Sequence, residues 1–199
     1  MRIVSLVPSL TLTLFDLGLD ATSIVGRTPW CIHPAEQVSD VPVVGGTKTP
    51  TLSKIKGAQP DLVVMDRDEN PKSVHDWCVA NGLPTFVCDV RHPRDVPLML
   101  RELGQAVNRS EAAEVHARAI EAMLRRAPDT NGRTALPLIW HRPLMAANGT
   151  TYAGNMLACL GFNVPNIEPD GTGYPEVSPE IILQHLSLIH ISEPTRHTR

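Results

Sequence analysis

Short runs of aliphatic and β-branched residues alternate along the chain with stretches whose apolar residues recur at helical spacing. The clearest runs are Arg2–Val7, Ile24–Arg27 and Asp61–Met65, and a helical pattern over Lys72–Ala80 follows the third. Runs that are mostly apolar at successive positions indicate strands buried on both faces. Such strands separated by helices predict a parallel sheet with helices on its faces, which is an α/β fold.

Residues with capping chemistry suggest where the predicted helices begin and end. We expect Ser9 to cap a helix that runs to about Leu17, where Gly18 stops it. Three further elements are predicted in the N-terminal part: a helix over Leu52–Gly57, a strand over Pro84–Val90 and a helix over Arg94–Val107.

A longer helix is predicted from Ser110 to about Ala127. At 1.5 Å per residue it would be roughly 25 Å long. Its apolar side is modest, so it suits a connection between two lobes, although it could also pack on one. A chain of 199 residues has room for two lobes. We therefore expect an N-terminal lobe over residues 1–109, a connecting helix over 110–127 and a second lobe over 128–185.

The second lobe is predicted to be truncated. Its expected elements are a strand over Leu136–His141, a helix from Thr151 to about Leu160, and a helix beginning at Ser178-Pro179-Glu180. Residues 186–196 (LSLIHISEPTR) resemble the in-frame translation of a sequencing adapter, so residues 186–199 are predicted to be non-native. The alternative is a natural amphipathic strand.

Composition and motif content argue against several classes of function. The net charge of −3 offers no basic surface for a nucleic acid. No apolar run approaches the roughly 18 residues that a membrane span needs, and the N-terminus carries no recognisable export signal. The four cysteines are scattered without a C-x-x-C pair, and no hydrolase motif is present, so we expect a protein that is not an enzyme.

Six segments carry a resemblance to a known family by their order along the chain. They are RIVSLVPSLT at 2–11, WCIHP at 30–34, VGGTKTP at 44–50, PDLVV at 60–64, DEN at 68–70 and YPEVSPEIIL at 174–183. Together they resemble the substrate-binding proteins of ABC importers for cobalamin, haem and iron siderophores. Within that class they are most similar to the cobalamin-binding-like helical backbone metal receptors. The resemblance covers residues 1 to about 185.

This resemblance implies two α/β lobes with parallel sheets, joined by one rigid helix, with a ligand in the cleft between them. It implies that cobalamin, haem or an iron chelate is the ligand, that no catalytic cofactor is required, that the chain is a monomer, and that it acts in the periplasm beside an ABC permease.

Several features depart from the pattern, among them Leu12, where family members usually have Glu. The cobalamin importers dock through an acidic residue near the start of the helix that follows the Asp61 strand, and Pro71-Lys72-Ser73 contains none. The export signal is also missing. The alternative function is therefore a cytoplasmic metal- or corrinoid-handling protein with the same fold and no transporter. An enzyme on a similar scaffold is a third hypothesis, but the cysteines are not arranged to bind a cluster.

Candidate ligand-binding residues lie in the loops that follow predicted strands and on scattered aromatic side chains. They are Ser9, Trp30, Gly46, Thr47, Lys48, Arg67, Glu69, Asn70, Trp140 and Tyr152. Glycine N–H groups and a lysine could bind an anionic group, but two adjacent glycines also suit a tight turn. Asn70 could equally start a helix. The aromatic rings could form flat apolar walls for a macrocycle or belong to the core.

Cys31 and His33 are the candidate metal ligands. Thiolate and imidazole both bind soft and borderline metals, and their C-x-H spacing would let them share one ion or cap the metal of a corrin or haem. The alternative is a buried thiol beside a loop histidine.

Overall fold

Four of the predicted strands form one parallel sheet. They are β1 (Ile3–Ser5), β2 (Ile24–Arg27), β3 (Leu62–Asp66) and β4 (Thr85–Cys88), in the order β2-β1-β3-β4. Val4 lies opposite Val63, and both side chains are fully buried. The predicted α/β fold with a parallel sheet is therefore confirmed here, because strands covered on both faces need apolar residues at successive positions.

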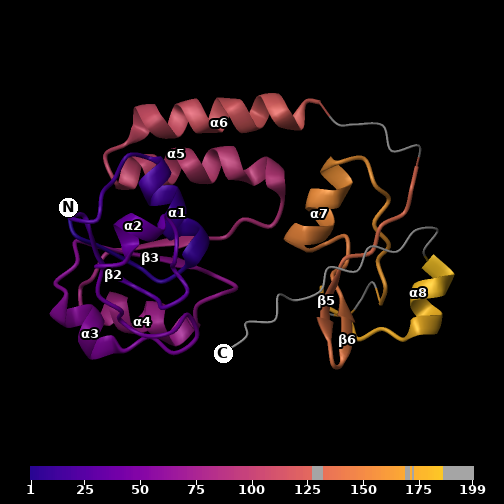
Figure 1. The fold of residues 1–199 in the computed structure, drawn as a ribbon, viewed down its shortest axis with the longest axis horizontal. Helices are drawn as coiled ribbons and strands as arrows, with labels where there is room; N and C mark the ends of the chain where they lie inside the picture. The colour runs from indigo at the N-terminus through magenta and orange to yellow at the C-terminus, as the bar shows by residue number, and fades with distance from the viewer. Residues whose placement is uncertain (127–131, 169–170, 172, 186–199) are drawn as a thin grey trace. The chain divides into compact units, whose positions relative to one another are not determined.

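The computed structural model describes residues 1–126, 132–168, 171 and 173–185, which divide into two units (Figure 1). Unit 1 comprises residues 1–89 and 98–117, and unit 2 comprises residues 90–97 together with the described residues from 118 onward. The segment that resembles an adapter, at 186–199, lies outside the described residues. The predicted lobe limits at 109, 127 and 185 stay predictions.

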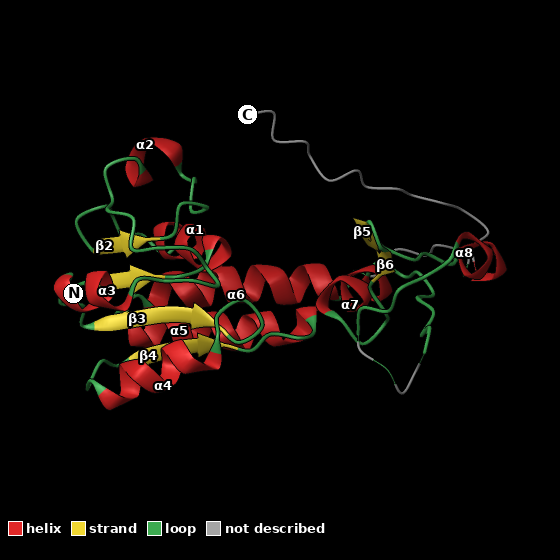
Figure 2. Cartoon of the chain, turned by 90° about the horizontal axis from the view of Figure 1, so that it is seen from below, coloured by secondary structure: helices red, strands yellow, loops and turns green. Residues whose placement is uncertain are grey.

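Helices cover both faces of the unit 1 sheet (Figures 1 and 2). On one face, α3 (Leu52–Gly57) and α4 (Lys72–Ala80) pack against the strands, with Ile55 and Cys78 in one apolar cluster with Met65. On the other face lie α1 (Pro8–Asp16) and the unit 1 residues of α5 (Val96–Ala106) and α6 (Ser110–Leu124). The bounds of α3 and α4 are those predicted.

The start of α1 differs from the prediction. Pro8 is the first residue of the helix and Val7 is its N-cap, with no side-chain hydrogen bond, so the prediction that Ser9 caps this helix is wrong. Proline suits the first position because its ring already holds φ near the helical value. Gly18 does end the helix, with φ +84° and a hydrogen bond from its N–H to the Phe15 oxygen.

Other helix ends shift by a few residues. The predicted helix over Arg94–Val107 is a short 3₁₀ helix, η1 (Pro93–Asp95), followed by α5. Helix α6 begins at Ser110 as predicted and ends at Leu124; the predicted end, Ala127, lies outside the described residues. A short helix, α2 (Ala35–Val38), was not predicted.

Unit 2 contains a small core formed by its own elements. These are β5 (Leu138–His141), β6 (Leu144–Ala146), α7 (Tyr152–Cys159) and α8 (Pro179–His185). Thr151 caps α7 by accepting the Gly154 N–H at 3.1 Å, as the predicted start of that helix requires. Leu138, Ile167 and Ile182 pack in one buried cluster.

The strand pair of unit 2 corrects the expectation of a second parallel sheet. Strands β5 and β6 are antiparallel, and β6 was not predicted. Only Arg142 and Pro143 separate them, so the chain turns straight back, whereas parallel neighbours need a crossover of a dozen or more residues. Thr134 and Asn163 form a parallel bridge in the same unit.

None of the helices in the described ranges is both long enough and apolar enough to cross a membrane.

Candidate functional site

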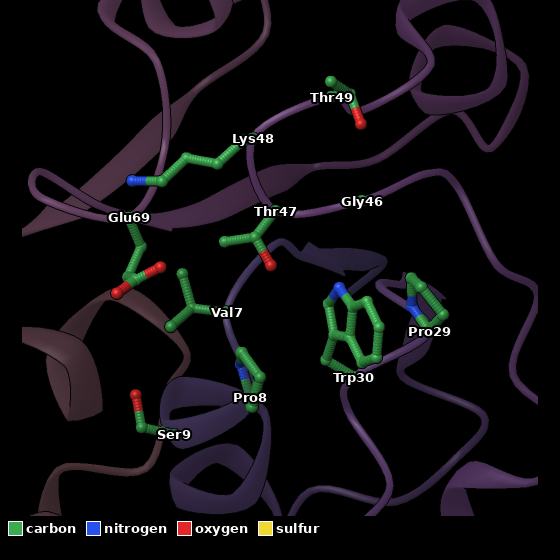
Figure 3. Close-up of a pocket in the computed structure, with 10 residues that line it drawn as sticks. All are labelled: Val7, Pro8, Ser9, Pro29, Trp30, Gly46, Thr47, Lys48, Thr49 and Glu69. Atoms are coloured by element: carbon green, nitrogen blue, oxygen red, sulfur yellow. The ribbon is translucent and has the colours of Figure 1, made fainter. Parts of the chain in front are cut away.

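A pocket of about 660 Å³ opens at the carboxyl ends of the strands of unit 1 (Figure 3). Parallel α/β sheets place ligand-binding loops at this edge because all strands end there. Its lining comes from the start of α1 and three loops and consists of Val7, Pro8, Ser9, Pro29, Trp30, Gly46, Thr47, Lys48, Thr49 and Glu69. Six of the predicted site residues are therefore brought together: Ser9, Trp30, Gly46, Thr47, Lys48 and Glu69.

The apolar wall of the pocket is formed by the turn after β2 and by the chain that enters α1. Trp30 is 62% exposed and lies with Pro29 on one side of the pocket, while Glu69 and Lys48 lie on the other (Figure 3). An indole of such exposure offers a flat apolar face to a ligand. The prediction from sequence missed Val7, Pro8, Pro29 and Thr49. Val7 ends one predicted strand and Pro29 lies two residues beyond another, which was an available signal.

The Gly45–Pro50 loop is a tight turn that holds Thr47 and Lys48 at the pocket. Gly45 has φ +118°, and a Cβ on it would lie 2.6 Å from the Thr51 nitrogen, so only glycine fits. Backbone hydrogen bonds of 3.2 Å join Gly46 and Thr49 in both directions. The tight-turn interpretation is confirmed for this loop, and it coexists with a place in the pocket.

Two charged side chains, Lys48 and Glu69, lie across the pocket from Trp30, and they differ in their hydrogen-bond partners. The Lys48 Nζ donates a hydrogen bond to the backbone oxygen of Asp68 at 2.5 Å. Within the described residues, the Glu69 carboxylate has no hydrogen-bond or ion-pair partner, although its backbone N–H is bonded to Asp66. The acid is thus free to contact a ligand, and the ammonium keeps two N–H donors beside the one bonded to Asp68.

Two predicted residues from the same loop lie outside the pocket lining. Arg67 pairs with Asp89, and this hydrogen bond and charge raise the pKa of the guanidinium above its ordinary value. Asn70 is buried and bonds to backbone groups of three segments: it accepts from the Asp66 N–H and donates to the oxygens of Leu6 and Thr47. Its observed contacts are those of a residue that shapes the pocket loop.

The two candidate metal ligands have different environments. Cys31 is 1% exposed, and its sulfur lies 3.1 Å from the hydroxyls of both Thr11 and Thr28. His33 is exposed. In the part of the chain that the structure describes, no group of three or more His, Cys, Asp or Glu side chains is placed to hold a metal ion. A site built on two ligands stays a prediction.

The aromatic candidates of unit 2 are not among the residues that line this pocket. Trp140 is 59% exposed, and its indole N–H donates to the Arg142 oxygen at 2.9 Å. Tyr152 is the first residue of α7 and is partly exposed. Their binding roles stay predictions.

A parallel sheet with a polar-rimmed, aromatic pocket at its carboxyl edge characterises α/β proteins that bind small molecules. A family model described as periplasmic binding protein matches residues 3–187, so the chain belongs to that family. Proteins similar to this chain include vitamin B12-binding and haem-binding proteins.

Individual relatives agree with the family. The vitamin B12-binding protein of Pectobacterium carotovorum subsp. carotovorum is 24% identical over 190 residues, which cover 92% of this chain and 67% of the relative. Its counterpart from Pectobacterium atrosepticum is 23% identical over 193 residues, 92% of this chain and 68% of the relative.

Solved structures are similar in fold. The periplasmic vitamin B12-binding protein of Vibrio cholerae gives a TM-score of 0.79 at 17% identity, and a periplasmic haem-binding protein of Roseiflexus sp. RS-1 gives 0.77 at 24%. Each comparison covers 92% of this chain and 72% of the other. At these identities the likeness shows the fold, and it confirms the α/β architecture that the sequence predicted.

Proposed function

We propose that the chain binds a metal-containing chelate without catalysis and acts as the substrate-binding component of an ABC importer. The observation that carries this proposal is the unit 1 pocket, which combines an exposed indole with a polar rim. The family match to periplasmic binding proteins supports it. Its volume is within the range of about 300–1,000 Å³ that is usual for small-molecule sites.

The proposed ligand is a flat macrocycle or an iron chelate that stacks on Trp30. The family resemblance implies a ligand between two lobes, and Trp140 and Tyr152 are the contributors proposed from the second lobe. Cys31 and His33 are the proposed metal ligands. The curated relatives named above are vitamin B12-binding proteins, so a corrinoid is the first candidate and haem the second.

The Glu69 carboxylate favours a corrinoid over haem. Haem carries two propionates, which this carboxylate would repel. The Lys48 ammonium could attract one propionate, because its bond to the neutral Asp68 oxygen leaves it its charge and two further N–H donors. The amide side chains of a corrinoid are neutral and can donate hydrogen bonds to Glu69.

The alternative proposal is a cytoplasmic metal- or corrinoid-handling protein with the same fold. Helix α4 follows β3 and begins with Pro71 as N-cap and no acidic residue in its first turn. This observation favours the alternative because permease docking in the cobalamin importers is expected to use an acid there. Export of the product of the complete gene would favour the importer proposal, and retention in the cytoplasm the alternative.

The test is a titration of the purified chain with cyanocobalamin and with haemin, followed by visible absorption. A saturable spectral shift that Trp30→Ala weakens supports binding in this pocket. Loss of the shift in His33→Ala, with His185→Ala as the control for an exposed histidine, supports a metal ligand at His33. No shift with either compound would contradict the tetrapyrrole proposal.

A further inference from the structure

A buried polar cluster lies beneath the aromatic wall of the pocket. Ser5, Thr11 and Thr28 are each 0% exposed and Cys31 is 1% exposed. The Thr11 hydroxyl lies 2.8 Å from the Ser5 Oγ and 3.1 Å from the Cys31 Sγ, and the Thr28 hydroxyl lies 3.1 Å from the same sulfur. Among the described residues, no buried side-chain N or O atom lacks a partner, so the cluster is fully satisfied.

The Thr28–Cys31 turn is buried at its two ends and exposed at its tip. The Cys31 N–H bonds to the Thr28 oxygen at 3.2 Å, and the Arg27 guanidinium donates to that oxygen at 3.2 Å. Between the buried ends, Pro29 and Trp30 are exposed and line the pocket. The sulfur thus joins the second end of the turn to α1 through Thr11 and to the first end through Thr28.

The Trp30 side chain depends on this turn for its position. Within the described residues its indole has no hydrogen-bond partner, and most of its surface is exposed. Because Trp30 is 62% exposed, its place in the pocket depends on the backbone that carries it. A shift of the turn would move the ring with it and weaken the binding of a ligand that stacks on the ring.

We infer that Cys31 is a positioning residue for the ligand site, which holds the Pro29–Trp30 wall in place through the hydroxyls of Thr11 and Thr28. The inference rests on the proposed function in so far as Trp30 contacts the ligand. It gives the cysteine a role that needs no metal ion.

The chain offers a matched control for the sulfur. Cys78 is 0% exposed in the same unit and packs in the apolar cluster between α4 and the sheet. Cys78→Ala deletes the same atom from a buried site away from the pocket lining. Cys31→Ser keeps a hydrogen-bonding atom in place, and Thr28→Val removes one hydroxyl while leaving the thiol.

The first measurement needs no ligand. Acrylamide quenching of tryptophan fluorescence is measured for each variant and for the same variant carrying Trp30→Phe, and the difference isolates Trp30. Cys31→Ala and Thr28→Val are expected to change the quenching of Trp30, while Cys31→Ser and Cys78→Ala leave it near the wild-type value. An equal change in Cys78→Ala, or none in Cys31→Ala and Thr28→Val, would overturn the inference.

The second measurement is cyanocobalamin affinity at a temperature where every variant is folded. Cys31→Ala is expected to weaken binding about tenfold, with most of the affinity restored by Cys31→Ser. In a Trp30→Ala background the same change is expected to have almost no effect, because the wall is already absent. A tenfold loss in both backgrounds would contradict a role through Trp30. If the wild-type chain binds no cyanocobalamin or haemin, the proposed function fails, and the quenching measurement still decides the inference.

Discussion

The side-chain amide of Asn70 donates a hydrogen bond of 2.9 Å to the backbone oxygen of Thr47. The same nitrogen lies 3.3 Å from the Leu6 oxygen, and the Asn70 oxygen accepts the Asp66 N–H at 2.8 Å. One buried side chain thus links the loop after β3 to the pocket turn and to the end of β1. The polar half of the pocket is held by a residue that does not line it.

Removal of this amide should loosen the pocket. Asn70→Ala leaves two buried backbone oxygens without a donor, so we expect a loss of about 1–3 kcal/mol in the free energy of unfolding. Weaker cyanocobalamin binding should accompany it. Urea denaturation measures the first effect. The control is Asn81→Ala, whose exposed amide donates to the Trp77 oxygen and should cost less than about 0.5 kcal/mol. Equal losses of unfolding free energy in the two variants would contradict the supporting role of Asn70 at the pocket.

Replacement by alanine should change the stability of the protein in opposite directions at two glycines, Gly45 and Gly57. Gly45→Ala forces a side chain into φ +118° and against the Thr51 backbone, so we expect destabilisation by at least about 1–3 kcal/mol. Gly57 in α3 has open space at its Cβ position, so Gly57→Ala should stabilise by up to about 0.5–1 kcal/mol. Thermal unfolding of both variants tests this, and a stable Gly45→Ala would show that the turn can take another conformation.

At the contact between α5 and α6, glycine should be more stable than alanine, which is the reverse of the usual preference in a helix. A Cβ on Gly104 would lie 2.3 Å from the Ala113 Cβ. Gly104→Ala should therefore destabilise by about 1–3 kcal/mol, although alanine is the better helix former by about 1 kcal/mol. A double-mutant cycle with Ala113→Gly checks the cause, since the second change should recover part of the loss. Strictly additive losses would exclude a clash between these two residues.

Glu69 should discriminate between the candidate ligands. Removing its charge in Glu69→Gln should strengthen haemin binding several-fold, because the repulsion of the propionates is lost, and should not strengthen cyanocobalamin binding. The ratio of the two dissociation constants at low ionic strength is the measurement. Glu102→Gln, which makes the same charge change on α5, should leave the ratio unchanged. An unchanged ratio in Glu69→Gln would remove the charge argument for a corrinoid.

The loop before β2 should show a defined pH dependence. The Thr22 hydroxyl is the main cause that lowers the pKa of Asp20 below 3.8, with further bonds from Ser23 and the Thr22 N–H. Because the folded pKa is the lower one, this contribution to stability is present above pH 3.8 and is lost as pH falls through the folded value. Asp20→Asn should therefore destabilise the protein at neutral pH.

Urea midpoints of wild type and Asp20→Asn measure this effect across pH. The difference should shrink below pH 3.8, where the wild-type carboxyl also becomes protonated. A difference that stays constant across the range would mean that the charge of Asp20 does not stabilise the loop.

Local patterns in the sequence predicted several elements closely. Both ends of Lys72–Ala80 agree with α4, because its apolar spacing and the Asn81-Gly82 pair are properties of neighbouring residues. The placement of Trp30, Lys48 and Glu69 at one pocket also followed from local evidence. Trp30 and Glu69 come after predicted strands, parallel strands end at one edge, and Lys48 lies in a glycine-containing loop.

Predictions that depended on distant partners did less well. The unit 2 strand pair is antiparallel, where a second parallel sheet was expected. One local prediction also failed, since α1 starts at Pro8 rather than after a Ser9 cap. Asn70 was expected to contact a ligand or start a helix, whereas its amide bonds to Leu6, 64 residues away.

The sequence by itself determined the α/β class, the limits of α3 and α4 and the loops that supply the pocket, because periodicity and capping act within a few residues. Only the tertiary structure decided that the Cys31 sulfur lies between two hydroxyls and that Asn70 supports Thr47. Those contacts join segments far apart in the chain, and they form only when the sheet has brought the loops together.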